Sequence, residues 1–124
     1  MTLYPNKVFV FGSNLLGIHG KGAALEAKQK WGAIQGIGYG RMGNSFAIPT
    51  KETPYTTLPL STIQHYVRHF LDYALFSDSE FLVTPIGCGL AGYTPEQIAP
   101  FFKQRSSNVI LPEIFLLQLG LKQD

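Results

Sequence analysis

The chain has 124 residues, a length that fits one domain, and we expect residues 1–124 to form a single domain. Hydrophobic residues make up 45% of the chain and charged residues 15%, a balance that favours a packed globular core and argues against disorder. The net charge is +2 with scattered Lys and Arg, so a dedicated nucleic-acid footprint is absent, and one cysteine excludes disulfide frameworks and multi-cysteine zinc sites.

The first expected element is a strand at "KVFVFG", residues 7–12, an apolar run that ends at a glycine. This run is too short for a signal peptide or a membrane span, and the single cysteine suits a reducing compartment. We therefore expect a cytoplasmic protein with no membrane partner. A glycine-rich turn, "GSNLLGIHGKG", follows, and the good helix formers of residues 23–31 predict an amphipathic helix after it.

The middle of the chain is rich in glycine and proline. Residues 32–45 contain five glycines and predict an irregular loop or a loose hairpin with its tip at 40–43. "FAIPT", residues 46–50, predicts a second buried strand that ends at Pro49, because proline cannot donate to a sheet ladder. Lys51 would then lie just past the carboxyl end of that strand, at the start of a proline-punctuated surface connector over 51–60.

The second half of the chain alternates helices and strands. Apolar residues recur at helical spacing over 60–76, and Ser61 with Gln64 suggests a capping box at the start of that helix. Residues 80–87 predict a third strand. Thr94, followed by Pro95 and Gln97, predicts the start of a third helix, and residues 108–117 predict one or two final strands.

These elements predict an α/β fold: a mixed, mostly parallel sheet with helices on both faces. In such folds ligands bind at the carboxyl ends of the strands. Three unusual segments fall at such ends, namely "GSNLLGIHGKG", "PTK" and "GCGLAGYTPEQ". Glycine lets a backbone approach a ligand closely, and the amides at a following helix N-terminus favour an anion. A pyrophosphate would suit two such loops.

Each of these loops has a structural alternative. Glycines after strands also serve only as tight turns, and neither loop spells a P-loop or a dinucleotide-binding fingerprint. Lys51 is either a surface lysine or a functional group, in which case it acts as a cation for phosphate or as an amine nucleophile.

The remaining chemistry-bearing side chains are three histidines and a cysteine. His19 lies inside the first glycine loop, within reach of a ligand, whereas His65 and His69 are interpreted as a solvated helix face. Cys88, between two glycines before a helix, is in a setting that could lower a thiol pKa. A cysteine nucleophile also needs a base, and His19 is the only nearby candidate. A small buried thiol is therefore the favoured interpretation of Cys88.

Taken together, these segments resemble the macrodomain superfamily, whose members bind ADP-ribose. The similarity is closest to a small branch that includes glycohydrolases removing ADP-ribose from acidic side chains and relatives removing it from DNA. "PIGCGLAGYTPEQIAPFF" resembles the phosphate loop and following helix of that branch, and "GSNLLGIHGKGAALEAKQKWG" resembles its first ligand loop. "FAIPTK" resembles the strand whose following lysine is the nucleophile there. The resemblance implies a three-layer α/β/α fold and covers most of residues 7–105.

The resemblance also implies a set of site residues. Lys51 would be the catalytic nucleophile on the distal ribose, and the backbone of residues 87–93 would hold the diphosphate. No cofactor and no metal are implied; the partner would be ADP-ribose or an ADP-ribosylated substrate. The ligand-binding residues would be Gly12, Ser13, Asn14, His19, Gly20, Lys21, Gly22, Thr50, Ile86, Gly87, Cys88, Gly89, Leu90, Ala91, Gly92 and Tyr93.

One position departs from this pattern. In the lysine-dependent branch an acidic residue follows "GCGL", where this chain has Ala91. The acidic residue that reads adenine near the family's N-terminus also has no counterpart here. Three hypotheses follow: an ADP-ribosyl hydrolase that uses Lys51, a non-catalytic sensor of ADP-ribose or a related nucleotide, and a structural or partner-binding domain that has lost the ligand.

Overall fold

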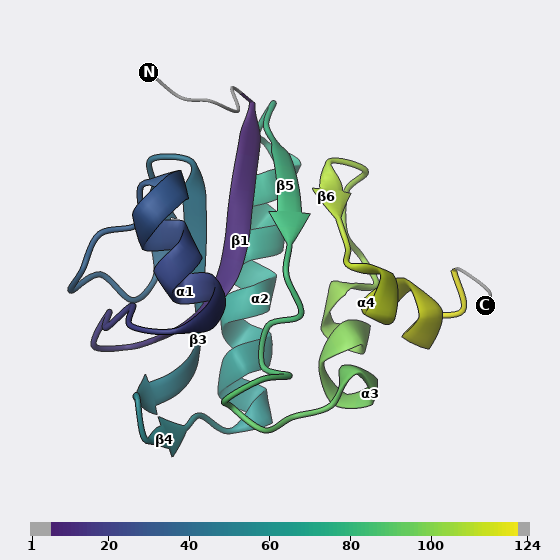
Figure 1. Cartoon of the computed structure of the whole chain (residues 1–124). Helices are drawn as coiled ribbons and strands as arrows, with labels where there is room; N and C mark the ends of the chain where they lie inside the picture. The colour runs from purple at the N-terminus through teal and green to yellow at the C-terminus, as the bar shows by residue number, and fades with distance from the viewer. Residues whose placement is uncertain (1–5, 122–124) are drawn as a thin grey trace.

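A computed structural model describes residues 6–121 as a mixed α/β domain (Figure 1). The strands are β1 (Lys7–Asn14), β2 (Gly40–Met42), β3 (Ser45–Thr53), β4 (Thr56–Thr57), β5 (Glu80–Val83) and β6 (Val109–Ile110). The helices are α1 (Gly22–Glu26), α2 (Leu60–Leu75), α3 (Pro95–Ile98) and α4 (Glu113–Gln118). A π-helical segment, η1 (Ala27–Trp31), continues α1, and a 3₁₀ segment, η2 (Ala99–Phe102), continues α3.

The strands form one six-stranded sheet in the order β2-β3-β1-β5-β6, with β4 paired to β3. The β1–β3, β1–β5 and β5–β6 pairs are parallel, whereas β2 and β4 each run antiparallel to β3. The predicted mixed, mostly parallel sheet is therefore confirmed. Because β3, β1 and β5 are parallel neighbours, the loops that follow them emerge from the same edge of the sheet (Figure 1).

Side chains of β1 alternate between two hydrophobic clusters. Val8 and Val10 belong to the larger cluster, which α2 supplies through residues such as Ile63 and Val67. Phe9 and Phe11 belong to the smaller cluster with Ala27 of η1, and the Phe9 ring stacks on Trp31 at a centroid distance of 5.2 Å. Since successive side chains of a strand point to opposite faces, the clusters lie on opposite sides of β1. This double burial explains why its sequence is continuously apolar.

Two helix starts show how the sequence sets the element bounds. The predicted helix over 60–76 is confirmed as α2, but Ser61 does not cap it: Pro59 is the N-cap, and its carbonyl accepts from the Thr62 and Ile63 amides. The chain is thus already helical at Ser61, which leaves no cap position there. The prediction for Thr94 is confirmed, because its hydroxyl and the Gln97 side chain form a reciprocal capping box at the start of α3.

Three strand predictions were wrong in their bounds. β5 ends at Val83, although the third strand was predicted over residues 80–87. β3 continues through Pro49 to Thr53, and the β1–β3 register shifts where Ser13 pairs with Pro49 and Asn14 with Lys51. A bulge tolerates a proline because one ladder bond is already missing there. The last predicted strands shrink to the two residues of β6, and α4 follows, since Pro112 ends the extended segment and acts as the helix N-cap.

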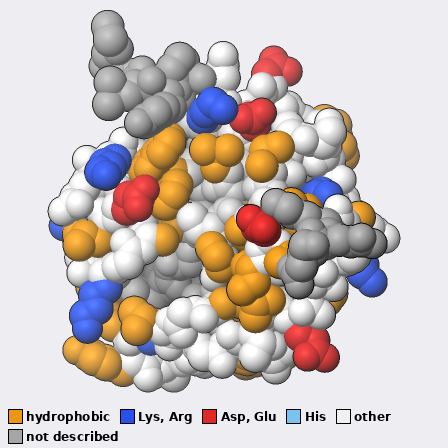
Figure 2. Space-filling model, turned by 45° about the vertical axis from the view of Figure 1, so that its right-hand side comes forward, with side chains coloured by type: hydrophobic (Ala, Val, Ile, Leu, Met, Phe, Trp, Pro, Cys, Tyr) orange, Lys and Arg blue, Asp and Glu red, His pale blue; other side chains and the backbone are white. Residues whose placement is uncertain are grey.

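The glycine-rich stretch 32–45 leads into a hairpin formed by β2 and β3. Its turn lies at residues 43–44, because residues 40–42 pair with β3 as β2, so the predicted tip at 40–43 was wrong by a few residues. Over residues 6–121, no helix has both the length and the apolar character needed to cross a membrane. Figure 2 shows hydrophobic side chains exposed at several places on one face, with basic and acidic side chains dispersed among them.

Candidate functional site

A cavity of about 860 Å³ opens at the sheet edge where β1, β3 and β5 end. Its wall combines residues from three segments that are far apart in the sequence: 12–24, 50–55 and 84–91. The parallel pairing explains this convergence, because it sets Asn14 at the end of β1 directly beside Lys51 near the end of β3. The volume lies in the range of about 300–1,000 Å³ typical of small-molecule sites.

The cavity brings together most of the residues that the sequence indicated. Of the seventeen predicted site residues, those on its wall are Gly12, Ser13, Asn14, Gly20, Lys21, Gly22, Thr50, Lys51, Ile86, Gly87, Gly89, Leu90 and Ala91. The others are not part of the wall: His19, Cys88, Gly92 and Tyr93. The two glycine loops and Lys51 therefore share one cavity, as the strand order requires.

Asn14 shapes the first glycine loop from within. Its amide nitrogen donates to the Ile18 carbonyl at 2.9 Å, and its amide oxygen accepts from the Ile18 N–H at 3.0 Å. Gly17, at φ +71°, allows this tight return, and a Cβ there would lie 2.2 Å from the Ile37 nitrogen. Asn14 is 7% exposed, so its side chain braces the loop while its backbone contributes to the cavity wall.

His19 anchors the first loop to residues 34–37 and does not line the cavity. Its ring is fully buried, and Nε2 lies 3.1 Å from the Ile34 carbonyl and 3.0 Å from the Ile37 carbonyl. Both partners are acceptors, so Nε2 carries a proton and donates. The His19 amide donates to the Gln35 side chain at 3.2 Å, and the ring packs edge-on against Phe11. The geometry gives His19 a structural role beneath the loop.

Past His19 the first loop becomes open. Gly20, Lys21 and Gly22 are exposed, and an added Cβ at either glycine would meet no atom within 4 Å. Lys21 is the N-cap of α1, where no side chain caps the first turn. This part of the wall is therefore bare backbone beside one lysine side chain.

The second glycine loop, residues 84–93, is closed by its own backbone. The Tyr93 amide donates to the Gly87 carbonyl at 2.9 Å, and the Gly92 amide donates to the Gly89 carbonyl at 3.0 Å. Within the described chain, the amides of Gly89, Leu90 and Ala91 donate no hydrogen bond. These three residues line the cavity, so their N–H groups are available to a ligand.

The helix after this loop does not meet the expectation from sequence. The first turn of α3 is capped by Thr94, which accepts from the Gln97 amide, and neither residue is part of the cavity wall. At the second loop, the expected contribution of the helix N-terminus is thus replaced by the loop amides that precede it. At the first loop, Gly22, Ala23 and Ala24 at the start of α1 do line the cavity.

Lys51 reaches the cavity from β3. Its side chain is half-buried, and Nζ donates to the Pro54 carbonyl at 2.6 Å. Thr50 beside it is buried, and its hydroxyl lies 3.4 Å from the Ser13 carbonyl. Lys51 lies within β3 because the strand continues to Thr53, so the prediction that it lies past the strand end was wrong by a few residues.

The charge of the cavity wall has one sign. Lys21 and Lys51 are its charged side chains, and among the residues described no Asp or Glu lines it. Glu52, next to Lys51 in the chain, is exposed and outside the wall. Ala91, the residue after "GCGL", lines the wall. Its carbonyl accepts a hydrogen bond from the Thr57 hydroxyl at 3.1 Å. Such a wall suits an anion, and among the described residues it offers no carboxylate to act as a general acid beside Lys51.

Cys88 and Tyr93 face the protein interior. Both pack against the larger cluster, and the Tyr93 hydroxyl donates to the Leu58 carbonyl at 2.6 Å. Burial raises the pKa of the Cys88 thiol from its usual value, so the expectation that its setting could lower that pKa was wrong. A raised pKa argues against a thiolate nucleophile at neutral pH and agrees with a packing role.

The sequence missed one side of the cavity. Thr53, Pro54 and Tyr55, at the turn between β3 and β4, line the wall, although their segment was predicted to be a surface connector. Leu16 and Ile18 also line it and are 52% and 42% exposed. The available signal was apolar residues placed among glycines and prolines, where no helix or strand could bury them.

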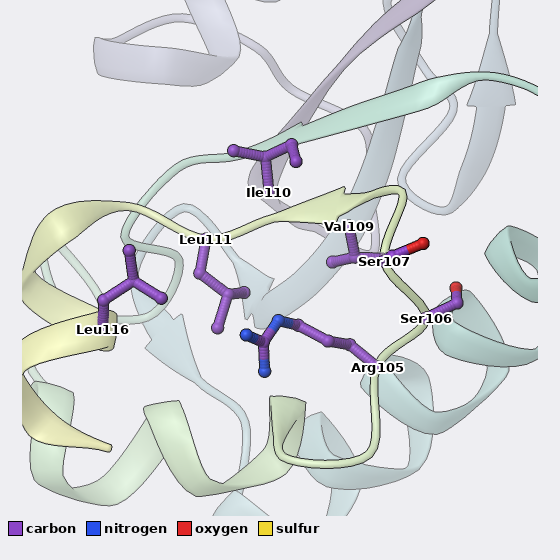
Figure 3. A pocket seen from close by; sticks show the side chains of 7 residues that line it. All are labelled: Arg105, Ser106, Ser107, Val109, Ile110, Leu111 and Leu116. Atoms are coloured by element: carbon purple, nitrogen blue, oxygen red, sulfur yellow. The ribbon is translucent and has the colours of Figure 1, made fainter. Parts of the chain in front are cut away.

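A second cavity, of about 520 Å³, lies beside β6. One stretch of chain, residues 105–116, supplies all of its wall. In Figure 3 the side chains of Arg105, Leu111 and Leu116 point toward its centre, whereas Ser106 and Ser107 lie to one side. None of the predicted site residues contributes to it.

Two further observations complete the description of the site. His65 and His69 are exposed on α2 with ring centroids 4.5 Å apart, outside the cavity wall, and no group of three or more His, Cys, Asp or Glu in residues 6–121 could hold a metal ion. No protein-family model matches the chain, and no curated protein or solved structure matches it either. Function is therefore inferred from the geometry and chemistry of the cavity.

Proposed function

We propose that the protein binds ADP-ribose or a related nucleotide diphosphate in the cavity at the ends of β1, β3 and β5, with the diphosphate on the two glycine loops. The observation that carries this proposal is the composition of the wall. Gly89, Leu90 and Ala91, whose amides donate no hydrogen bond within the described chain, line one cavity with two lysines, and no carboxylate among the described residues opposes an anion there. Backbone amides and cations are the groups that hold phosphates in proteins.

The resemblance to macrodomains supports the choice of ADP-ribose within this class. On this proposal the chain has the three-layer α/β/α arrangement of a macrodomain, and the backbone around Gly20 to Gly22 contacts the distal ribose. Gly92 and Tyr93 would support the phosphate loop from behind, since Tyr93 closes that loop through its amide.

A thermal-shift screen with ADP-ribose, ADP, NAD and inorganic pyrophosphate tests the proposal. A ligand that binds only the folded state raises the apparent melting temperature. Gly89→Val is the matched blocking variant: an added Cβ there meets no atom within 4 Å, so we expect the fold to tolerate a larger side chain at this position of the cavity wall. We expect the variant to keep its melting temperature and lose the ligand-induced shift. No shift with any of the four ligands, or an unchanged shift in Gly89→Val, would contradict the proposal.

A second candidate function, hydrolysis of an ADP-ribosyl linkage, is favoured by one observation: the Lys51 ammonium group reaches the cavity. In this reaction the unprotonated Nζ forms a bond to C1 of the distal ribose. The bond from C1 to the linked group breaks, and that group leaves with the electron pair and takes up a proton. Water then hydrolyses the lysine adduct, which releases the sugar and restores the amine. Because no carboxylate of the described chain lines the wall, we favour binding over this reaction.

Lys51→Arg separates the two functions. Arginine keeps the positive charge, but its guanidinium group stays protonated and does not act as a nucleophile. For a binding protein we expect Lys51→Arg to retain affinity for ADP-ribose within a few-fold, whereas Lys51→Ala weakens it. For a hydrolase, both variants would abolish turnover of an ADP-ribosylated substrate. A third outcome is that none of the tested ligands binds the wild-type protein. That result would favour a structural or partner-binding domain.

A further inference from the structure

The aromatic ring of Tyr55 stands out on the cavity wall. Tyr55 is 94% exposed, the largest fraction among the exposed large apolar side chains of the described residues. It lies at the turn between β3 and β4 and contributes to the cavity wall. Nearly the whole ring is therefore available to a ligand that enters the cavity.

The turn that carries Tyr55 is fixed on both sides. The Lys51 ammonium donates to the Pro54 carbonyl at 2.6 Å, immediately before Tyr55 in the chain, and the Tyr55 amide donates to the Thr53 hydroxyl at 3.1 Å. The Thr57 hydroxyl donates to the Ala91 carbonyl at 3.1 Å, which ties β4 to the second glycine loop. The backbone of Tyr55 is thus held next to a cation and to the loop with free amides, so little ordering remains to be done on binding.

A second exposed apolar side chain lines the same cavity. Leu90, which precedes Ala91 in the second glycine loop, is 72% exposed and lines the same cavity. An ammonium group, an exposed aromatic face and an exposed leucine together suit a flat ring joined to an anionic group. Stacking on an aromatic side chain contributes about 1–3 kcal/mol per nucleobase, as measured by alanine substitution.

We infer that Tyr55 is a stacking platform that selects ligands with a planar heteroaromatic ring attached to the phosphate-bearing chain. The inference rests on the proposed function, because it assigns a class of ligand to the same cavity. The ring has two possible sources in a nucleotide diphosphate: the adenine of the ADP half, or a ring carried by the other half, as in NAD. Both present the same flat face to Tyr55.

Calorimetric titration of the full chain with four probes tests this inference: inorganic pyrophosphate, ADP, ADP-ribose and NAD. Tyr55→Leu keeps apolar bulk but removes the flat ring, and Tyr55→Phe keeps the ring as the matched control. We expect Tyr55→Leu to weaken binding of ring-bearing probes about tenfold, and Tyr55→Phe to stay within about twofold of the wild type. Pyrophosphate, which has no ring, should bind all three proteins equally.

The pattern of losses identifies the source of the ring. A loss for ADP, ADP-ribose and NAD assigns adenine to Tyr55, and a loss confined to NAD assigns the second ring; both support the inference. Equal affinities in Tyr55→Leu and wild type for every ring-bearing probe would overturn it, as would an equal loss for pyrophosphate. These results differ from failure of the proposed function itself, in which no probe binds the wild-type protein.

Discussion

The two cavities of this protein differ in how the chain builds them. The cavity at the ends of β1, β3 and β5 collects residues from three distant segments, 12–24, 50–55 and 84–91, whereas the cavity beside β6 is made by residues 105–116 alone. The first contains two lysines, bare glycine backbone and amides without partners in the described chain. The second contains one arginine, two serines and four apolar side chains, all from one stretch of chain.

This difference indicates why one cavity is the better candidate for a ligand site. Parallel neighbours in a sheet bring their following loops together whatever the sequence distance between them, and those loops expose backbone groups in a concave space. A cavity made by one local stretch has no such convergence.

The largest expected effect concerns the two kinds of glycine in the first loop. Gly17→Ala places a Cβ 2.2 Å from the Ile37 nitrogen at a residue with φ +71°, so we expect the free energy of unfolding to fall by roughly 2–4 kcal/mol. Gly20→Ala is the matched control, because its Cβ meets no atom within 4 Å, and we expect a change within about 0.5 kcal/mol. Urea denaturation of both variants measures the difference. Equal losses would show that the loop is not braced against residues 34–37 as described.

A smaller effect is expected from the charged side chains of the two cavities. Lys21→Ala removes a cation from the wall of the first cavity, and we expect affinity for ADP to fall about fivefold. Arg105→Ala removes the cation of the second cavity and should leave that affinity unchanged. Calorimetry at low and high salt checks both, since the lysine contribution should shrink as ionic strength rises. A greater loss in Arg105→Ala would reverse the assignment of the site.

The smallest expected effect is the contribution of the Cys88 thiol to the pH dependence of the free energy of unfolding. Burial raises the pKa of its thiol above the unfolded value, so the thiol contributes no pH dependence well below pH 9, where it is protonated in both states. As pH rises above about 8.5, the unfolded chain ionises first and the free energy of unfolding falls. Denaturation between pH 8 and 10 should show a steeper fall in wild type than in Cys88→Ala. Tyr39, whose pKa is also raised, contributes equally to both proteins. Identical slopes would indicate an exposed thiol.

Much of the fold could be predicted because its signals are local. The apolar run of β1, the helical spacing of α2 and the Thr94 capping box each act within a few residues, and each is found where the sequence indicated. The prediction that the strand ends at Pro49 was wrong because β3 accommodates this proline at a bulge against β1. That bulge arises from a pairing between distant segments, which the local sequence does not reveal. The short β6 and the helix after Pro112 were missed because an apolar run of that length fits either element.

The site was predictable to the extent that strand ends are predictable. Lys51 and the two glycine loops were expected on one edge and do meet there. The role of His19 was not foreseeable, since its partners at Ile34 and Ile37 come from a loop without a regular pattern. Tyr55 was missed because its turn is formed by the pairing of β3 with β4, a strand of only two residues that gives no pattern in the sequence.

Amide chemical shifts during a titration with ADP-ribose test the central claim most directly, because they report on both cavities in one experiment. We predict that the amide signals of Gly20, Gly89, Leu90 and Ala91 shift with a common saturation curve, and that those of Arg105, Ser106 and Ser107 stay in place. Saturable shifts confined to residues 105–116, or no saturable shift in the two glycine loops, would contradict the assignment of the cavity at the ends of β1, β3 and β5 as the nucleotide site.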